Sequence, residues 1–314
     1  MEPGPSSLPR RPWPCMLSLM STTIGPGGGS RPNYDSPRDL AAYLEVRGLG
    51  MRKRYGQNFL VNPDVRRRIA DLAEAASGSL VWEIGPGLGA MTAELLNRGV
   101  RVEAFEIDPG FSTALREIYD GQEGFRLREG DFLRTRKAAW AEAKPDRILG
   151  NLPYNAAAAL VAAILEGGPP PERMVFTVQK EAARRMASSP GTKDYASFTV
   201  LCRSVCDVRI AFDIGSSSFW PAPRVTSSVV VLSPRADAAP EAGTPGFTRF
   251  VRSLFSSRRK TAVNNLRALG FSGSKAAEIL RSMGFSADAR AETLTPDELL
   301  AFYRTLGGPD GDRD

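Results

Sequence analysis

Four short polar motifs recur at nearly regular intervals in the middle of the chain, and their spacing constrains the fold more than any other feature. Each motif follows a short apolar segment typical of a buried strand. The intervals between the motifs are 21, 25 and 20 residues, counted at Gly85, Glu106, Asp131 and Asn151. One interval matches a strand followed by a helix. The pattern predicts a mostly parallel α/β sheet with all four motifs on one edge, at the carboxyl ends of its strands, where such sheets bind ligands.

Hydrophobic patterning predicts the elements around these motifs. Asn62 and Pro63 are residue types preferred at the start of a helix, and the apolar stripe of this helix is Val65, Ile69, Leu72 and Ala76. Alternation over 208–212, together with the apolar segment 227–232, predicts an antiparallel pair at the edge of the sheet. The expected parallel strands are 80–84, 101–106, 125–128, 147–150 and 174–178, and the other expected helices are 38–49, 90–97, 156–165 and 197–204.

Composition along the chain predicts its division into domains. Residues 1–32 hold seven prolines and five glycines, so we expect 1–33 to be a disordered leader, with Met20 as an alternative start. We expect an α/β domain over 34–235, a linker over 236–246, a small all-α domain over 247–306 and a tail over 307–314. Apolar runs in the chain are all shorter than a membrane-spanning helix requires.

The residue types present exclude several kinds of chemistry. The chain has no histidine, which excludes Ser-His-Asp and Cys-His catalysis and a histidine general base. Its three cysteines, Cys15, Cys202 and Cys206, are too few and too irregularly spaced for a disulfide framework or a four-ligand zinc site, so we expect free thiols in a reducing cytoplasm and no metal. The net charge of +6 favours a polyanionic partner such as a nucleic acid.

The first three motifs predict a nucleoside ligand. Gly85, Gly87 and Gly89 form a glycine turn that lets a ligand approach the backbone, but no Lys-Ser/Thr pair follows to hold a polyphosphate. Glu106 is placed to accept hydrogen bonds from two ribose hydroxyls, and Asp131 to accept one from an adenine amino group. S-adenosylmethionine is the cofactor that fits this set best.

The fourth motif, Asn151-Leu152-Pro153-Tyr154, predicts methyl transfer to an exocyclic adenine amine. Such an amine is a poor nucleophile because its lone pair is delocalised into the ring. The Asn151 side-chain oxygen and the Leu152 carbonyl would accept both of its N–H groups and direct the lone pair at the methyl group. Pro153 would stiffen the turn, and Tyr154 would stack on a base extruded from its helix. Alone, an Asn-x-Pro sequence is equally typical of an ordinary turn.

The chain resembles the KsgA (RsmA) family of small-subunit rRNA adenine N6,N6-dimethyltransferases. The likeness runs from about Tyr34 to Tyr303, and its motifs Gln57–Leu60 and Phe255–Lys260 are specific to that group. Two departures from the family pattern, Ala156–Ala159 and Trp220, bear on the fit of the target base. The matching segments are 53–60, 83–89, 151–155, 178–181, 219–225 and 254–260.

This resemblance implies a fold, an activity and a set of site residues. The fold is the Rossmann-like class I S-adenosylmethionine-dependent methyltransferase fold. The activity is N6,N6-dimethylation of two adjacent adenosines in a hairpin loop near the 3′ end of 16S rRNA, in the 30S subunit or its precursor, by a cytoplasmic monomer that takes part in ribosome biogenesis. Tyr154 and Phe219 are implied to hold the adenine. The implied cofactor contacts are Asn58, Leu60, Gly85, Gly87, Glu106, Asp131 and Asn151.

Basic clusters predict where RNA phosphates bind. Residues 251–270 carry five positive charges and no acid, beside Asn264 and Asn265. A charge run of this kind is also typical of a merely solvated surface. The predicted RNA contacts are Arg252, Arg258, Arg259, Lys260 and Arg267 in this segment, and Arg52, Lys53 and Arg54 nearer the N-terminus.

Three other functions remain open at this point. The same chemistry on large-subunit rRNA would confer macrolide-type resistance, although the segment Phe255–Lys260 favours the small-subunit class. A non-enzymatic RNA-binding assembly or transcription factor on the same fold is disfavoured by the intact Asn151–Tyr154 motif. A DNA adenine methyltransferase is disfavoured because no segment resembles a sequence-reading domain.

Overall fold

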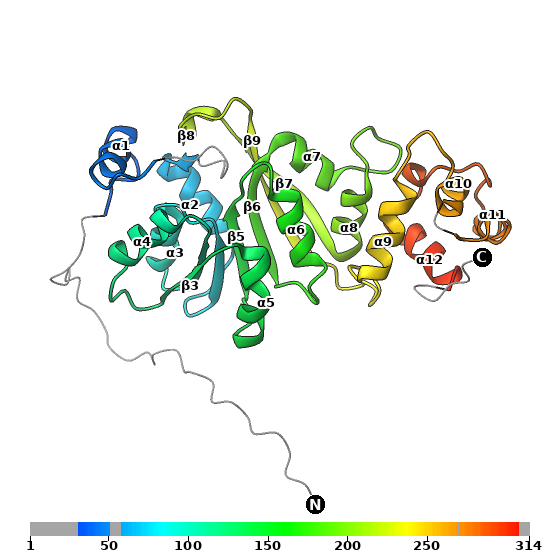
Figure 1. Cartoon of the computed structure of the whole chain (residues 1–314), viewed down its shortest axis with the longest axis horizontal. Coiled ribbons are helices and arrows are strands. Elements are labelled where there is room, and N and C mark those ends of the chain that lie inside the picture. Colours follow the sequence, from blue (N-terminus) through cyan, green and yellow to red (C-terminus); the bar gives the residue numbers. More distant parts are fainter. Residues whose placement is uncertain (1–30, 51–57, 269, 308–314) are drawn as a thin grey trace, which may run out of the picture.

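The computed structural model describes residues 31–50, 58–268 and 270–307 (Figure 1). Most of the expected leader, the basic residues Arg52, Lys53 and Arg54, and all of the expected tail except Gly307 lie outside the described residues.

A seven-stranded sheet with the order β4-β3-β2-β5-β6-β9-β7 forms the centre of the molecule. Strands β2 to β6 are mutually parallel, and β9 runs antiparallel to both β6 and β7, which confirms the predicted antiparallel edge. The strands are β2 (Leu80–Ile84), β3 (Arg101–Glu106), β4 (Phe125–Glu129), β5 (Arg147–Asn151), β6 (Arg173–Gln179), β7 (Cys206–Ile214) and β9 (Ser227–Pro234).

Helices cover both faces of the sheet. Successive side chains of a strand point to opposite faces, and accordingly Trp82 packs into the hydrophobic core on one face and Val81 into the core on the other. Helices α5, α6, α7 and α8 contribute to the first core, and α2 and α3 to the second. The helices are α1 (Pro37–Val46), α2 (Pro63–Leu72), α3 (Ala90–Leu96), α4 (Pro109–Ile118), α5 (Phe132–Glu142), α6 (Ala157–Leu165), α7 (Lys180–Ala187) and α8 (Ser197–Val205).

The start of α2 follows the sequence prediction, but its end does not. The Asn62 side chain accepts hydrogen bonds from the backbone amides of Asp64 and Val65, which confirms the predicted cap. The helix ends at Leu72, and Glu74 then adopts a positive φ of 47° that takes the chain away from the helical path. Ala76 is therefore exposed and does not extend the apolar stripe.

A two-stranded ribbon beside the main sheet was not expected. β1 (Phe59–Leu60) pairs antiparallel with β8 (Phe219–Trp220), with Phe59 opposite Trp220. The two rings stack with their centroids 6.1 Å apart. This ribbon holds the segment that precedes α2 against the segment that precedes β9.

The C-terminal part of the chain is helical and packs at one end of the molecule (Figure 1). Its helices α9 (Pro245–Leu254), α10 (Ala262–Arg267), α11 (Gly273–Ser282) and α12 (Pro296–Thr305) enclose a separate hydrophobic core. Tyr195 and Val200, from the preceding α/β part, belong to this same core. The two parts are therefore joined by shared packing as well as by the chain.

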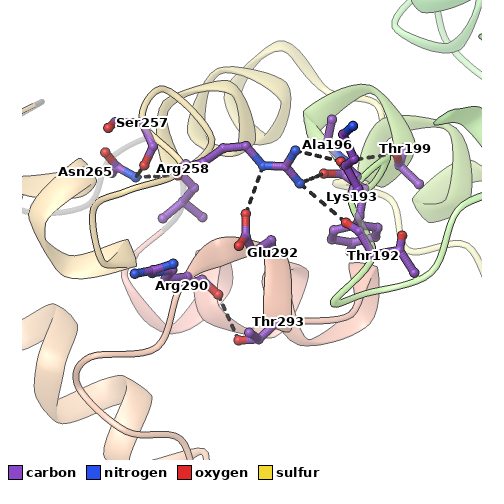
Figure 2. A network of polar contacts seen from close by, with 12 residues as sticks. Thr192, Lys193, Ala196, Thr199, Ser257, Arg258, Asn265, Arg290, Glu292 and Thr293 are labelled. Carbon is purple, nitrogen blue, oxygen red and sulfur yellow. Dashed lines mark hydrogen bonds and ion pairs between the residues drawn. The ribbon is translucent and has the colours of Figure 1, made fainter.

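Polar contacts add a second junction between the two parts (Figure 2). The Arg258 guanidinium donates to the Glu292 carboxylate at 2.9 Å and to the backbone carbonyls of Lys193, Tyr195 and Thr192 at 2.6, 3.0 and 3.4 Å. These contacts tie the turn before α10 to the loop that precedes α8. Across the described ranges, no helix has the length and apolar character needed to cross a membrane.

Candidate active site

A hollow lies at the carboxyl ends of β2, β3 and β5, on the edge where the sequence motifs were expected to meet. Nine of the predicted site residues line it. The glycine turn, Glu106 and the Asn151–Tyr154 motif therefore lie around one space, as the spacing predicts. The nine residues are Asn58, Leu60, Gly85, Gly87, Glu106, Asn151, Leu152, Pro153 and Tyr154.

The glycine turn cannot carry side chains at two positions. Gly87 has a φ of +60°, and a Cβ there would lie 3.2 Å from Cε1 of Phe59. Gly89 has a φ of +86°, and a Cβ there would lie 2.6 Å from Cε2 of Tyr119. The left-handed conformation and these close neighbours both require glycine. Of the three glycines, Gly85 and Gly87 line the hollow, so the backbone there faces a ligand without an intervening side chain.

The Glu106 carboxylate is held at the hollow by backbone amides. One of its oxygens accepts from the Gly87 amide at 3.1 Å and the other from the Asp108 amide at 2.8 Å. The residue is only 4% exposed, and this burial raises the pKa of Glu106 to about 7 in spite of the two amide hydrogen bonds. Glu106 is thus a fixed acceptor at the end of β3, as a ribose-binding role requires. Together with the open glycine backbone, it fits the nucleoside part of S-adenosylmethionine.

A second buried carboxylate, Glu83, also lines the hollow. Its side chain accepts a hydrogen bond of 2.5 Å from the Thr92 hydroxyl in α3. Burial, with a smaller contribution from the nearby charge of Glu106, raises the pKa of Glu83 to about 7. This hydrogen bond ties the end of β2 to the helix that follows the glycine turn.

The Asn151 side chain is oriented by a residue from a distant part of the chain. Its amide nitrogen Nδ2 donates to the backbone carbonyl of Asn58 at 2.9 Å. A carbonyl can only accept, so the nitrogen must face Asn58, and the side-chain oxygen Oδ1 is left for another donor. The backbone amide of Leu152 donates to the Thr177 carbonyl at 3.0 Å, which fixes the next residue of the motif to β6.

The Tyr154 ring stands at the hollow with its hydroxyl anchored elsewhere. The hydroxyl lies 2.7 Å from Oγ of Ser227, the first residue of β9. The residue is half-buried, and burial raises the pKa of Tyr154 above its usual value, against the opposing effect of the Ser227 hydrogen bond. Tyr154 is therefore a neutral aromatic ring at the hollow at neutral pH.

Two predicted site residues are not among those that line the hollow. The Asp131 carboxylate caps α5 by accepting from the Leu133 amide at 2.9 Å. Asp131 remains close to the site, since the Gly130 amide donates to the Glu106 carbonyl at 2.8 Å. Phe219 is 3% exposed and lies in the same core cluster as Leu60. The roles predicted for Asp131 and Phe219 stay predictions.

Several residues that line the hollow were not predicted from sequence. Ile107 is the most informative, because its apolar side chain is 43% exposed directly after Glu106. An exposed isoleucine beside a buried carboxylate offers an apolar contact to a flat ring, and its position directly after Glu106 was the available signal. The other unpredicted lining residues are Phe59, Pro86, Ala90, Met91 and Phe111.

The predicted RNA contacts of the C-terminal part differ in how free their charges are. Arg258 is engaged by Glu292 and three carbonyls, and Arg252 pairs with Glu166 at 2.8 Å. Arg259, Lys260 and Arg267 are exposed, and no ion pair joins them to other residues within the described ranges. Of this cluster, Arg259, Lys260 and Arg267 present the more accessible charges.

Comparison with known proteins gives consistent similarities in sequence. Residues 48–306 match the family model described as Ribosomal RNA adenine dimethylase. The chain is 41% identical over 285 residues to a protein of Treponema denticola named Ribosomal RNA small subunit methyltransferase A, covering 88% of this chain and 97% of that protein. It is 40% identical over 255 residues to the protein of the same name from Rubrobacter xylanophilus, covering 81% of this chain and 95% of that protein.

Two solved structures share the fold over most of the chain. A dimethyladenosine transferase from Plasmodium falciparum is 25% identical, with a TM-score of 0.65, and the match covers 78% of this chain and 96% of that one. The 23S rRNA methyltransferase ErmE is 26% identical, with a TM-score of 0.57, and the match covers 79% of this chain and 98% of that one.

Proposed function

Because the chain belongs to the ribosomal RNA adenine dimethylase family, we propose that it dimethylates the N6 amines of two adjacent adenosines near the 3′ end of 16S rRNA. The methyl donor is S-adenosylmethionine, and the natural substrate is the 30S subunit or its precursor. One observation carries the proposal: the Asn151–Tyr154 motif and the Glu106 carboxylate line the same hollow. The chain is an rRNA methyltransferase that acts in ribosome biogenesis.

The residues around the hollow divide between the cofactor and the base. Glu106 would accept from the ribose hydroxyls, and the open glycine backbone would lie against the rest of the cofactor. Ile107 would contact one face of the cofactor's adenine, and Asp131 would accept from its amino group. When bound, S-adenosylmethionine supplies an electrophilic methyl group on a sulfonium. Asn58 and Leu60 would close the cofactor side of the hollow.

Asn151 and Leu152 would present the target amine. Two acceptors that bind both N–H groups of N6 favour a pyramidal nitrogen, whose lone pair then points away from the acceptors and towards the methyl group. The contact to Asn58 keeps Oδ1 of Asn151 available for this task. No histidine is required, because the proton released from N6 can pass to water after the transfer.

Tyr154 would hold the target base by stacking. Its ring lines the hollow beside Pro153, so a base extruded from the RNA would meet the ring next to the two acceptors. Phe219 is proposed as the second aromatic contact. Phe219 is buried beside Leu60, so of these two rings Tyr154 is the one that lines the hollow.

Phosphate contacts from the helical part would supply most of the affinity for RNA. Arg259, Lys260 and Arg267 are exposed and carry three of the positive charges of that part, and Arg252 and Arg258 add to its positive potential. Arg52, Lys53 and Arg54 would extend the contact from the N-terminal side. We further propose that the protein acts as a monomer in the cytoplasm.

Mass spectrometry of rRNA nucleosides tests this function directly. Small subunits isolated from a strain without the enzyme would be incubated with the purified protein and S-adenosylmethionine, and the 16S rRNA then digested. Formation of N6,N6-dimethyladenosine at two adjacent positions is expected. The likeness to ErmE makes 23S rRNA the one alternative substrate to include, and primer extension on both rRNAs separates the two.

A further inference from the structure

The hydroxyl of Tyr154 faces away from the reaction space and is bound by the sheet. It lies 2.7 Å from Oγ of Ser227, whereas the Tyr154 side chain itself lines the hollow. Ser227 is fully buried and is not one of the residues that line the hollow. A residue outside the hollow therefore contacts the far end of the ring that is proposed to stack on the target base.

Ser227 is a rigid anchor because of its place in the sheet. It is the first residue of β9, and it pairs with Gln179 of β6 on one side and Ile214 of β7 on the other. Neighbours on both sides leave its backbone little freedom. The Tyr154 side chain has only two torsions, and holding its hydroxyl at one point fixes χ1 and with it the direction in which the ring points. Because a phenolic hydroxyl makes its hydrogen bonds close to the plane of its ring, the direction of the bond to Ser227 also limits rotation about χ2.

We propose that Ser227 is a positioning residue that holds the Tyr154 ring in position before the target adenine arrives. The inference rests on the proposed function and deepens it, since it concerns how the same site receives its base. Ser227 touches neither cofactor nor substrate, and its whole effect passes through the Tyr154 hydroxyl. A ring held in advance loses little freedom when the base stacks on it, which favours the geometry needed for transfer.

The proposal gives the Tyr154 hydroxyl a function that stacking alone does not. Tyr154→Phe keeps the aromatic ring but removes the anchor, and it leaves the buried Ser227 hydroxyl without its partner. Ser227→Ala removes the same anchor from the other side. The two variants should therefore slow methyl transfer to a similar extent.

The test is a double-mutant cycle in single-turnover methylation of small subunits from a strain without the enzyme. Ser227→Ala and Tyr154→Phe are each expected to lower the rate constant at saturating subunits by about three- to tenfold, as for one net hydrogen bond. The double variant should be no slower than either single variant, because both remove one contact. Affinities for S-adenosylmethionine and for the subunit should stay unchanged.

Ser228→Ala is the matched control. Ser228 is the next residue of the same strand and is equally buried, but its hydroxyl donates to the Asp213 carboxylate at 2.6 Å. The Ser228→Ala variant loses a buried hydroxyl from β9 but keeps the contact to Tyr154. Its rate constant for methyl transfer should therefore stay at the wild-type value. Any general weakening of the strand would appear in both serine variants.

Three results would overturn the inference. They are equal rates for Ser227→Ala and Ser228→Ala, a wild-type rate for Tyr154→Phe, and multiplied losses in the double variant. Should Ser227→Ala fail to fold, Tyr154→Phe decides alone, because its ring is only half-buried. A wild-type protein that methylates no rRNA adenine would instead refute the proposed function.

Discussion

Asn151 and Asn58 are 93 residues apart in the chain, yet the side-chain amide of the first donates a hydrogen bond of 2.9 Å to the backbone carbonyl of the second. This contact fixes which end of the Asn151 amide faces the hollow. The donor Nδ2 is bound to the Asn58 carbonyl. The acceptor Oδ1 is the atom that would bind the target amine in the proposed transfer. The residue that would present the amine is thus oriented in advance by a segment on the cofactor side of the hollow.

Cofactor affinity should depend on pH through Glu106. The carboxylate must be ionised to accept from the ribose hydroxyls, and its pKa in the free protein is about 7. Below that pH, binding must first displace a proton, so the dissociation constant should rise by up to about tenfold per pH unit. Calorimetric titration with S-adenosylmethionine between pH 5.5 and 8.5 measures this.

Glu106→Ala should bind the cofactor more weakly at pH 8 and lose this pH dependence, while the fold stays intact. The loss at pH 8 should not exceed about 3 kcal/mol for each charge-assisted hydrogen bond removed. Glu83→Gln serves as the control, because it removes the other hollow-lining carboxylate whose pKa is about 7. A wild-type dissociation constant in Glu106→Ala at pH 8 would refute the ribose contact.

Glu83 should reduce the stability of the free protein above neutral pH. Its pKa is about 7 in the folded state, above the ordinary value of 4.5, so the folded state holds the proton more tightly than the unfolded state. Stability linked to this group is fully present below pH 4.5 and is lost as pH rises to about 7. Glu83→Gln should therefore gain stability relative to wild type as pH rises through this window, as measured by urea unfolding at pH 5 and pH 8. An equal difference at both pH values would contradict the assignment.

Removing two exposed charges should weaken RNA binding without affecting the fold. Arg259→Ala with Lys260→Ala should lower the affinity for small subunits and reduce the slope of log K against log salt by about 1.4–1.8, the loss expected for two phosphate contacts. Filter binding at several salt concentrations measures the slope. The control is Arg134→Ala with Lys137→Ala, which removes two exposed cations from α5. If both double variants show the same slope, Arg259 and Lys260 do not contact RNA phosphates and are only solvated charges on the surface.

Arg258→Ala should act mainly on stability, in contrast to its neighbours. The variant removes the Glu292 ion pair and leaves three backbone carbonyls without this donor (Figure 2). We expect a loss of about 1–3 kcal/mol in unfolding free energy, against no change for Arg259→Ala. Denaturant unfolding compares the two variants. Equal stability would show that this junction contributes nothing to folding.

Sequence spacing predicted most of the sheet and the location of the site. The motifs at Gly85, Glu106 and Asn151 lie around one hollow because the carboxyl ends of parallel strands share an edge. What the spacing does not reveal is the orientation of each side chain. Asp131 lies two residues after the end of β4 and directly before α5, and its carboxylate accepts a hydrogen bond from the nearby amide of Leu133.

Sequence patterns could not predict the contacts between distant segments. The ribbon of β1 and β8 has two residues per strand, too few for any periodicity to appear. Its alternation also decides that Phe219 is buried while Trp220 stacks on Phe59. The hydrogen bonds from Asn151 to Asn58 and between Tyr154 and Ser227 join residues that are 93 and 73 positions apart, so no local pattern predicts them. For the same reason, a run of positive charges does not reveal that Arg258 is engaged within the protein.

The most direct test of the account is the rate of methyl transfer by Asn151→Ala. The variant lacks the side-chain acceptor but keeps the Leu152 carbonyl and the Tyr154 ring, so binding to small subunits should survive. Its single-turnover rate constant on subunits from a strain without the enzyme should fall by on the order of 10²–10³, the loss expected for one preorganised partner of the transition state. A near-wild-type rate constant would show that Asn151 does not present the amine and that the motif is structural.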